Sequence, residues 1–62
     1  MVHVMEDVFR ADCIAGFGVE DDYRLQLFLV GVPEPETYTY DTVEEMEQAR
    51  EAAIKEWEQE LK

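Results

Sequence analysis

The C-terminal third of the chain, residues 42–62, reads TVEEMEQAREAAIKEWEQELK and predicts one long amphipathic helix. Thr42 and Glu45 have the spacing of a capping box, in which each side chain bonds the backbone amide of the other residue. No glycine or proline follows as far as Lys62. At about 100° per residue the apolar side chains share one stripe. Its members are Val43, Met46, Ala49, Ala53, Ile54, Trp57 and Leu61. We therefore expect a helix over about 43–61, packed by this stripe against a sheet.

Period-two alternation predicts strands in the part of the chain that precedes the helix. Apolar residues occupy alternate positions from Phe9 to Val19 and again from Tyr23 to Leu29, with a polar link between the two runs. Such alternation is typical of strands with one face on a core, and a short polar link indicates an antiparallel hairpin. A third β-prone run, Thr-Tyr-Thr-Tyr, follows a proline-containing loop. The predicted strands cover about residues 8–19, 23–32 and 37–40.

These elements predict a small α+β domain, a three-stranded antiparallel meander with one C-terminal amphipathic helix packed on one face (β-β-β-α). One helix covers one face of a sheet, so apolar side chains on the opposite face need another cover. The residues expected there are Ile14, Phe28, Val30 and Val32. Three structures could cover this apolar face: an N-terminal flap or extra strand at residues 1–5, a second protomer, or a partner.

Composition places the chain among small acidic globular proteins. Its 62 residues carry 16 Asp and Glu against 5 Lys and Arg, which gives a formal net charge of -11. Hydrophobic residues make up 47% of the chain, too many for a disordered acidic tail. A chain of this length buries only about 60% of the surface that its unfolded form exposes. We therefore expect marginal stability in isolation and a tendency to associate.

Few residues suit catalysis or metal binding. The chain has no Ser or Asn, one His (His3) and one Cys (Cys13). This pair cannot complete a tetrahedral zinc site, and one Cys forms no internal disulfide. We expect Cys13 to lie on the inward face of its strand, where a thiol packs as a small apolar group. The composition thus indicates a protein without enzymatic activity, metal or cofactor.

Charge and hydropathy also argue against two classes of ligand. The few basic residues are scattered among acids, which disfavours direct binding of nucleic acid. An anionic membrane surface would repel the chain for the same reason. The longest apolar run, Leu27–Val32, is too short to span a bilayer, and Met1–Phe9 lacks the basic start of an export signal. We therefore expect a cytoplasmic protein.

The helix carries its acidic side chains on the two flanks of the apolar stripe. These are Glu44, Glu47, Glu51 and Glu58 on one flank, and Glu45, Glu56 and Glu60 on the other. An acidic face is usually only solvated. Here the excess charge extends over a domain with little stability to spare, and its self-repulsion lowers that stability further. We therefore predict that the first flank, with Asp21 and Asp22 of the polar link, binds a basic partner.

Arg50 is the one charged residue that falls inside the apolar stripe. Two roles are open for it. In the first, its aliphatic stem packs in the core while its guanidinium reaches out to a carboxylate. In the second, it anchors an interface with another protein. We favour the packing role, because arginine stems commonly line apolar surfaces.

An acidic β-β-β-α domain of this size resembles the small inhibitors that phages use against bacterial defences, of which anti-CRISPR proteins are the best-known class. The acidic turn Glu20-Asp21-Asp22 and the helix start Thr42-Val43-Glu44-Glu45-Met46-Glu47 contribute to this resemblance. It covers the whole chain as size, charge and architecture, with no shared motif, so no functional residue is carried over. The resemblance implies a stoichiometric inhibitor that acts in a bacterial host cell, with carboxylates standing where phosphates would lie.

Two hypotheses follow. In the first, the chain is a non-enzymatic inhibitor or regulator that binds the basic nucleic-acid-binding surface of a protein or ribonucleoprotein complex. The more specific version of this hypothesis is that it binds by nucleic-acid mimicry. In the second, it is a small homodimeric structural or assembly module that pairs through the apolar face around Phe28, Val30 and Val32. The acidity would then serve only solubility.

Overall fold

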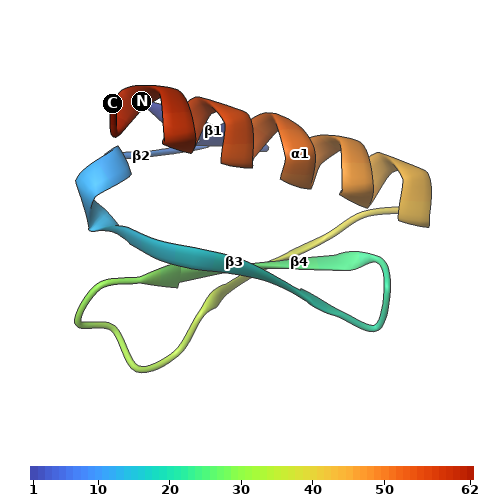
Figure 1. Cartoon of the computed structure of the whole chain (residues 1–62). Coiled ribbons are helices and arrows are strands. Elements are labelled where there is room, and N and C mark those ends of the chain that lie inside the picture. Colours follow the sequence, from blue (N-terminus) through green and yellow to red (C-terminus); the bar gives the residue numbers. More distant parts are fainter.

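The chain folds as a β-hairpin, a three-stranded antiparallel sheet and one C-terminal helix (Figure 1). The computed structural model describes all residues, 1–62. The elements are β1 (Val2–Val4), β2 (Asp7–Phe9), the 3-10 turn η1 (Ala11–Cys13), β3 (Ile14–Glu20), β4 (Arg24–Leu29), β5 (Glu36–Thr39) and α1 (Val43–Glu60). The predicted small α+β domain with a meander and a C-terminal helix is confirmed, and the β1–β2 hairpin is an additional element.

Strand β4 lies at the centre of the three-stranded sheet, whose order is β3-β4-β5. Its odd-numbered residues face α1, and Leu25 and Leu27 are completely buried there. Across the ladders, Leu25 opposes Tyr38 of β5, and Leu27 opposes Phe17 of β3. Helix α1 runs along this face of the sheet (Figure 1). The inward face of β4 that the alternation predicts is thus confirmed. Each of the two leucines packs there against an aromatic neighbour on the adjacent strand.

The N-terminal residues form a hairpin beneath the helix rather than a cover for the far face of the sheet. Val2 and Val4 of β1 are buried in the same core as the β4 leucines. Met5, in the turn, has a φ of 51°, an uncommon value for a residue with a side chain. The Tyr38 hydroxyl donates to Asp7 Oδ2 of β2 at 2.7 Å, which joins the hairpin to the β5 side of the sheet. The hairpin therefore completes the core on the helix side.

Helix α1 begins as the sequence predicts, with Thr42 as its N-cap. The Glu45 amide donates to Thr42 Oγ1 at 3.1 Å, whereas the Glu45 side chain does not return the bond, so only half of the capping box forms. At the other end, the Trp57 ring meets Phe17 edge-on with 5.6 Å between centroids. Its Nε1 donates to the Ala11 carbonyl at 3.1 Å. The tryptophan thus ties the helix to both η1 and β3.

The segment predicted as one strand over 8–19 is divided in the structure. Strand β2 ends at Phe9, and the next residues form the 3-10 turn η1, closed by a bond from the Cys13 amide to the Arg10 carbonyl. Strand β3 begins only at Ile14. The turn redirects the chain from the hairpin to the sheet. Simple alternation could not reveal it, because Ala11 and Cys13 also fit an apolar face.

The predicted orientations of Ile14 and Cys13 are wrong, and a β-bulge is the reason. The register between β3 and β4 shifts between Ile14 and Gly16, so one extra residue on β3 exchanges the two faces at this point. Ile14 is 5% exposed and belongs to the core, not to an outer apolar face. Cys13 is exposed instead of packed inward. Beyond the bulge, Phe17 lies on the predicted inward face.

Strand β4 is shorter than predicted, since it ends at Leu29 and not at Val32. Gly31 takes a φ of 79°, and the Val32 amide donates to the Leu29 carbonyl, so the chain turns immediately after the strand. Val30 and Val32 therefore lie in the loop and are 65% and 48% exposed. Phe28 remains in the strand on the outer sheet face, the face of β3-β4-β5 away from α1, and is 39% exposed. No other element of the chain covers this apolar group.

We expect Leu27→Ala to lower the free energy of unfolding by about 2–5 kcal/mol, because it leaves a cavity in the centre of the sheet. Val30→Ala is the matched control, since it removes similar atoms from an exposed loop position and should change stability by less than about 0.5 kcal/mol. Urea titration followed by Trp57 fluorescence measures both. Equal losses in the two variants would contradict this description of the core.

Candidate functional site

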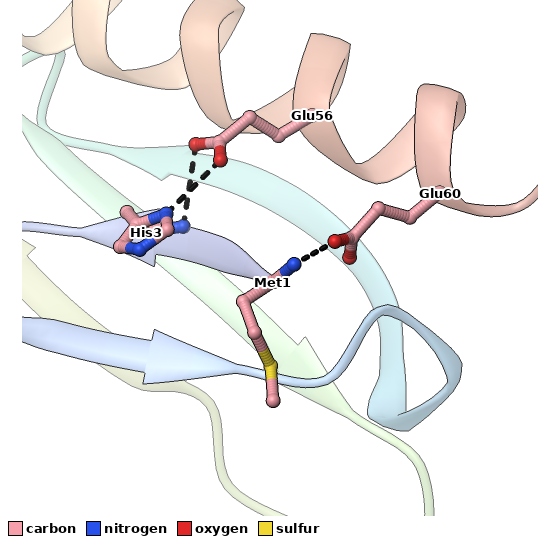
Figure 2. Close-up of polar contacts among 4 residues, drawn as sticks. All are labelled: Met1, His3, Glu56 and Glu60. Atoms are coloured by element: carbon pink, nitrogen blue, oxygen red, sulfur yellow. Dashed lines mark hydrogen bonds and ion pairs between the residues drawn. The ribbon is translucent and has the colours of Figure 1, made fainter.

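Six of the seven carboxylates of α1 form two groups that differ in what they contact, while the seventh, Glu45, is exposed and forms no ion pair. Two of them, Glu56 and Glu60, face strand β1 (Figure 2). Glu56 accepts from the His3 amide at 3.3 Å, and its second oxygen lies 3.0 Å from Nδ1 of the His3 ring. The α-amino group of Met1 pairs with Glu60. These β1-facing carboxylates therefore bind the free edge of β1 and contribute to the fold.

The contact with His3 changes the acidity of Glu56. The hydrogen bond from the His3 side chain favours the charged carboxylate and holds the pKa of Glu56 below its ordinary value of 4.5. Partial burial opposes this shift, while the His3 amide and the nearby positive charges add to it. The net direction is downward, so the ionised form of Glu56 is favoured in the folded chain.

The other group, which we call the free flank, consists of Glu44, Glu47, Glu51 and Glu58. All four side chains are exposed, and none forms an ion pair or a hydrogen bond within the chain. Glu47 lies about 180° around the helix from Glu56, since nine residues at about 100° each separate them. The free flank therefore faces away from β1. All four predicted partner-binding acids of the helix are thus exposed and unpaired, and the exposed Lys55 lies on the same side of the helix, four residues after Glu51.

Asp21 and Asp22 lie in the β3–β4 turn with φ values of 53° and 64°. The Tyr40 amide donates to the Tyr23 carbonyl at 2.9 Å, which brings this turn to the end of the molecule where α1 begins (Figure 1). Asp21 is 3.8 Å from the Arg24 guanidinium, whereas Asp22 has no partner. The turn therefore extends the acidic surface at the N-terminal end of the helix.

The predicted acids do not form a single compact cluster. Glu58 is fourteen residues beyond Glu44 on the helix, a distance of about 21 Å along its axis. The two aspartates of the turn are thus close only to the start of the free flank. The arrangement is an elongated acidic strip.

Arg50 is half-buried, and no carboxylate lies within ion-pair distance of it. Its Nε is buried without a hydrogen-bond partner. The predicted contact between its guanidinium and a carboxylate is therefore absent, although the half-burial agrees with packing of the stem. The hypothesis that Arg50 anchors an interface stays a prediction.

The residues with reactive side chains are not assembled into a site. His3 contacts Glu56, while Cys13 is exposed in η1. No group of three His, Cys, Asp or Glu side chains is placed to hold a metal ion, and the surface has no pocket. None of the helices has the length and hydropathy that crossing a membrane requires.

The structural role of Glu56 and Glu60 was missed by sequence reasoning, which treated them only as the second flank of the helix. Their partners lie more than fifty residues away, in β1. The alternation Val2-His3-Val4 was a weak signal for a strand there. The three-residue length of that strand gave no basis for placing it along the helix.

No protein-family model matches the chain, and no curated protein or solved structure is significantly similar to it. The residues of the chain itself therefore have to support any function proposed for it.

We expect Glu56→Gln to be less stable than the wild type at neutral pH, with a difference that disappears in acid. Because the folded pKa of Glu56 is below 4.5, its stabilising effect is present above that pH and is lost as the pH falls through the folded pKa. Urea unfolding at a series of pH values between neutral and about 3 measures the difference.

Glu58→Gln is the matched control for this experiment, because it makes the same change in net charge on the unpaired flank of the helix. We expect it to leave stability almost unchanged across the pH series. A Glu56→Gln difference that persists undiminished at the acid end would show that the His3 contact is not its source.

Proposed function

We propose that this protein is a non-enzymatic inhibitor or regulator that binds the basic nucleic-acid-binding surface of a partner protein or ribonucleoprotein complex. One observation supports this proposal above all. The free flank keeps its four carboxylates exposed and unpaired, while Glu56 and Glu60 on the other side of the same helix contact β1. Four of the five unpaired carboxylates of the helix thus lie on one flank.

The spacing of the free flank supports the mimicry form of this proposal. Glu44, Glu51 and Glu58 repeat every seven residues, so their positions are about 10 Å apart along the helix. Three phosphate-to-phosphate steps along one DNA strand advance by nearly the same distance, at about 3.4 Å each, so the carboxylates match every third phosphate. A surface that holds a nucleic-acid backbone therefore has cationic groups at a spacing that the helix can match.

Electrostatics supports the choice of partner. A net charge of -11 attracts a basic surface over a long range and accelerates encounter with it, while it repels free nucleic acid. The resemblance in size and charge to anti-CRISPR proteins suggests a bacterial host cell and a component of bacterial defence as the target. The acidic protein would thus inhibit its partner by occupying the site that the nucleic acid requires.

We expect the triple variant Glu44→Lys, Glu51→Lys, Glu58→Lys to fold normally and to lose capture of its partner. A pull-down from bacterial lysate, treated with nuclease and eluted with increasing salt, measures this. Wild-type capture should weaken steeply with salt and should be competed by added DNA or RNA, because charge carries the contact.

The matched control is Glu6→Lys, Glu34→Lys, Asp41→Lys, which changes the net charge equally at exposed positions outside the free flank. This control should keep most of the captured protein. Equal loss of capture in both triple variants would show that net charge, and not the free flank, determines binding. Capture that persists at high salt would contradict mimicry.

A second function, that of a small homodimeric assembly module, is favoured by the uncovered apolar group. Phe28 of β4 and the loop residues Val30 and Val32 are exposed at alternate positions of the chain, and no element covers them. Large exposed apolar groups are typical of protein contacts. In this case the acidic residues serve solubility alone.

Under the assembly hypothesis, the wild type should sediment as a dimer and the double variant Val30→Thr, Val32→Thr as a monomer, because the change removes apolar contact area at exposed positions. Sedimentation velocity over a range of concentrations measures this. A wild-type protein that stays monomeric at every concentration excludes this module.

A further inference from the structure

Strand β3 provides the one long sheet edge that the chain leaves open. Strands β1 and β2 have only three residues each, and the His3 amide of β1 donates to Glu56. Strand β5 has four residues and follows the prolines Pro33 and Pro35, and the hydroxyl of its Tyr38 donates to Asp7 of β2. Strand β3 has seven residues and a single neighbour, β4. Natural proteins usually protect edges of this length.

The register shows which backbone groups this edge offers. The Tyr23 carbonyl accepts from Tyr40 on the β5 side, so the odd-numbered residues of β4 bond toward β5 and the even-numbered residues toward β3. Gly16 and Gly18, which oppose even-numbered residues of β4, therefore bond inward. Phe17 and Val19 alternate with them and direct N–H and C=O groups away from the sheet.

The sequence of β3 lacks the usual protection of an edge. No charged residue and no proline occurs in Cys13–Val19, although 34% of the chain is charged. On the outer sheet face, a side chain at Gly16 would meet nothing within 4 Å. Next to it, the Phe28 ring lies over Gly18, where an added Cβ would be 3.0 Å from the ring. An incoming strand would thus find unpaired backbone groups, open space and an apolar ring.

The charge above this edge indicates what kind of strand would bind. The hairpin β1–β2 lies on the β5 side of the sheet, so the Glu56 side of α1 faces away from β3. Glu47, about 180° around the helix from Glu56, therefore lies on the β3 side, and Glu51 follows one turn later. A strand added to β3 would lie on the same side of the helix as Glu47, with the half-buried Arg50 between that carboxylate and the sheet.

We propose that the free edge of β3 binds an extended basic segment of the partner as an added β-strand, with Lys or Arg side chains directed to Glu47 and Glu51. Backbone hydrogen bonds to Phe17 and Val19 provide the docking, and the free flank selects basic sequences. The identity of the segment as part of the partner rests on the proposed function.

A second copy of the chain fits this edge less well than a basic segment does. Two β3 strands paired about a two-fold axis would place both helices on the same side of the joined sheet. Their free flanks would then face one another across the axis, and like charges so arranged repel. The same carboxylates attract a basic strand. Charge complementarity thus decides between the two occupants.

The test measures amide hydrogen exchange by NMR at low ionic strength, with a synthetic peptide of about nine residues that alternates Lys and Val as the probe. The Phe17 and Val19 amides, which have no partner in the free protein, should exchange about tenfold more slowly when the peptide binds. A peptide with Glu in place of Lys is the control and should give no protection.

Four results would overturn the proposal. Shifts of the Glu47 and Glu51 signals without protection of β3 would reject the edge but leave the acidic binding function standing. Equal protection by the Glu peptide would reject the basic chemistry. Protection that appears without peptide and rises with protein concentration would identify a second copy as the occupant. No effect of the Lys peptide at any position would reject the edge as well.

A pair of variants at Val19 tests the same edge independently. Val19→Pro removes the outward N–H group. An edge strand tolerates proline at such a position, because this N–H group forms no hydrogen bond within the sheet. It should weaken binding of the Lys-Val peptide about tenfold or more, while Val19→Thr, which keeps the N–H, should bind as the wild type does. Circular dichroism establishes that both variants fold, and equal binding by both would contradict the proposal.

Discussion

The burial of β4 beneath α1 is the interaction on which the rest of the structure depends. Leu25 and Leu27 are the largest completely buried side chains together with Val2, and only eight of the 62 residues are buried in total. This small core has to hold together a chain with a net charge of -11. The other contacts therefore differ chiefly in whether they neutralise acidic side chains or leave them free.

The chain does little to neutralise its own charge. Arg10 and Arg24 pair only with acids two to four residues away, at exposed positions where such pairs contribute little to stability. The contacts that connect distant elements use Glu56, Glu60 and Asp7. Thirteen of the sixteen acids remain outside these long-range contacts, and four of them form the free flank. Such an excess is consistent with a surface kept available for positive charge.

The sequence allowed the elements with strong periodic signals to be predicted. The helix, its Thr42 cap and the leucine face of β4 are examples, because each depends on neighbours within a few residues. The free flank also follows from helical spacing alone. Interactions between distant segments were not predictable in the same way: the pairing of Glu56 with His3, and the position of β1 under the helix, require contacts across more than fifty residues.

Failures of local prediction have one physical source, which is that alternation carries no information about an inserted residue. The bulge near Gly16 reversed the faces of Ile14 and Cys13, and the turn at Gly31 ended β4 before Val32. The extra residue of the bulge is Ala15, whereas the turn depends on the positive φ of Gly31.

Trp57 gives the chain an internal optical probe. It is the only tryptophan, and its indole contacts the Ala11 carbonyl of η1 and the Phe17 ring of β3. Phe17 belongs to the open edge strand, so a change in that strand alters the surroundings of the only indole. Its emission therefore reports the junction of helix, turn and edge at a single residue, without any added label.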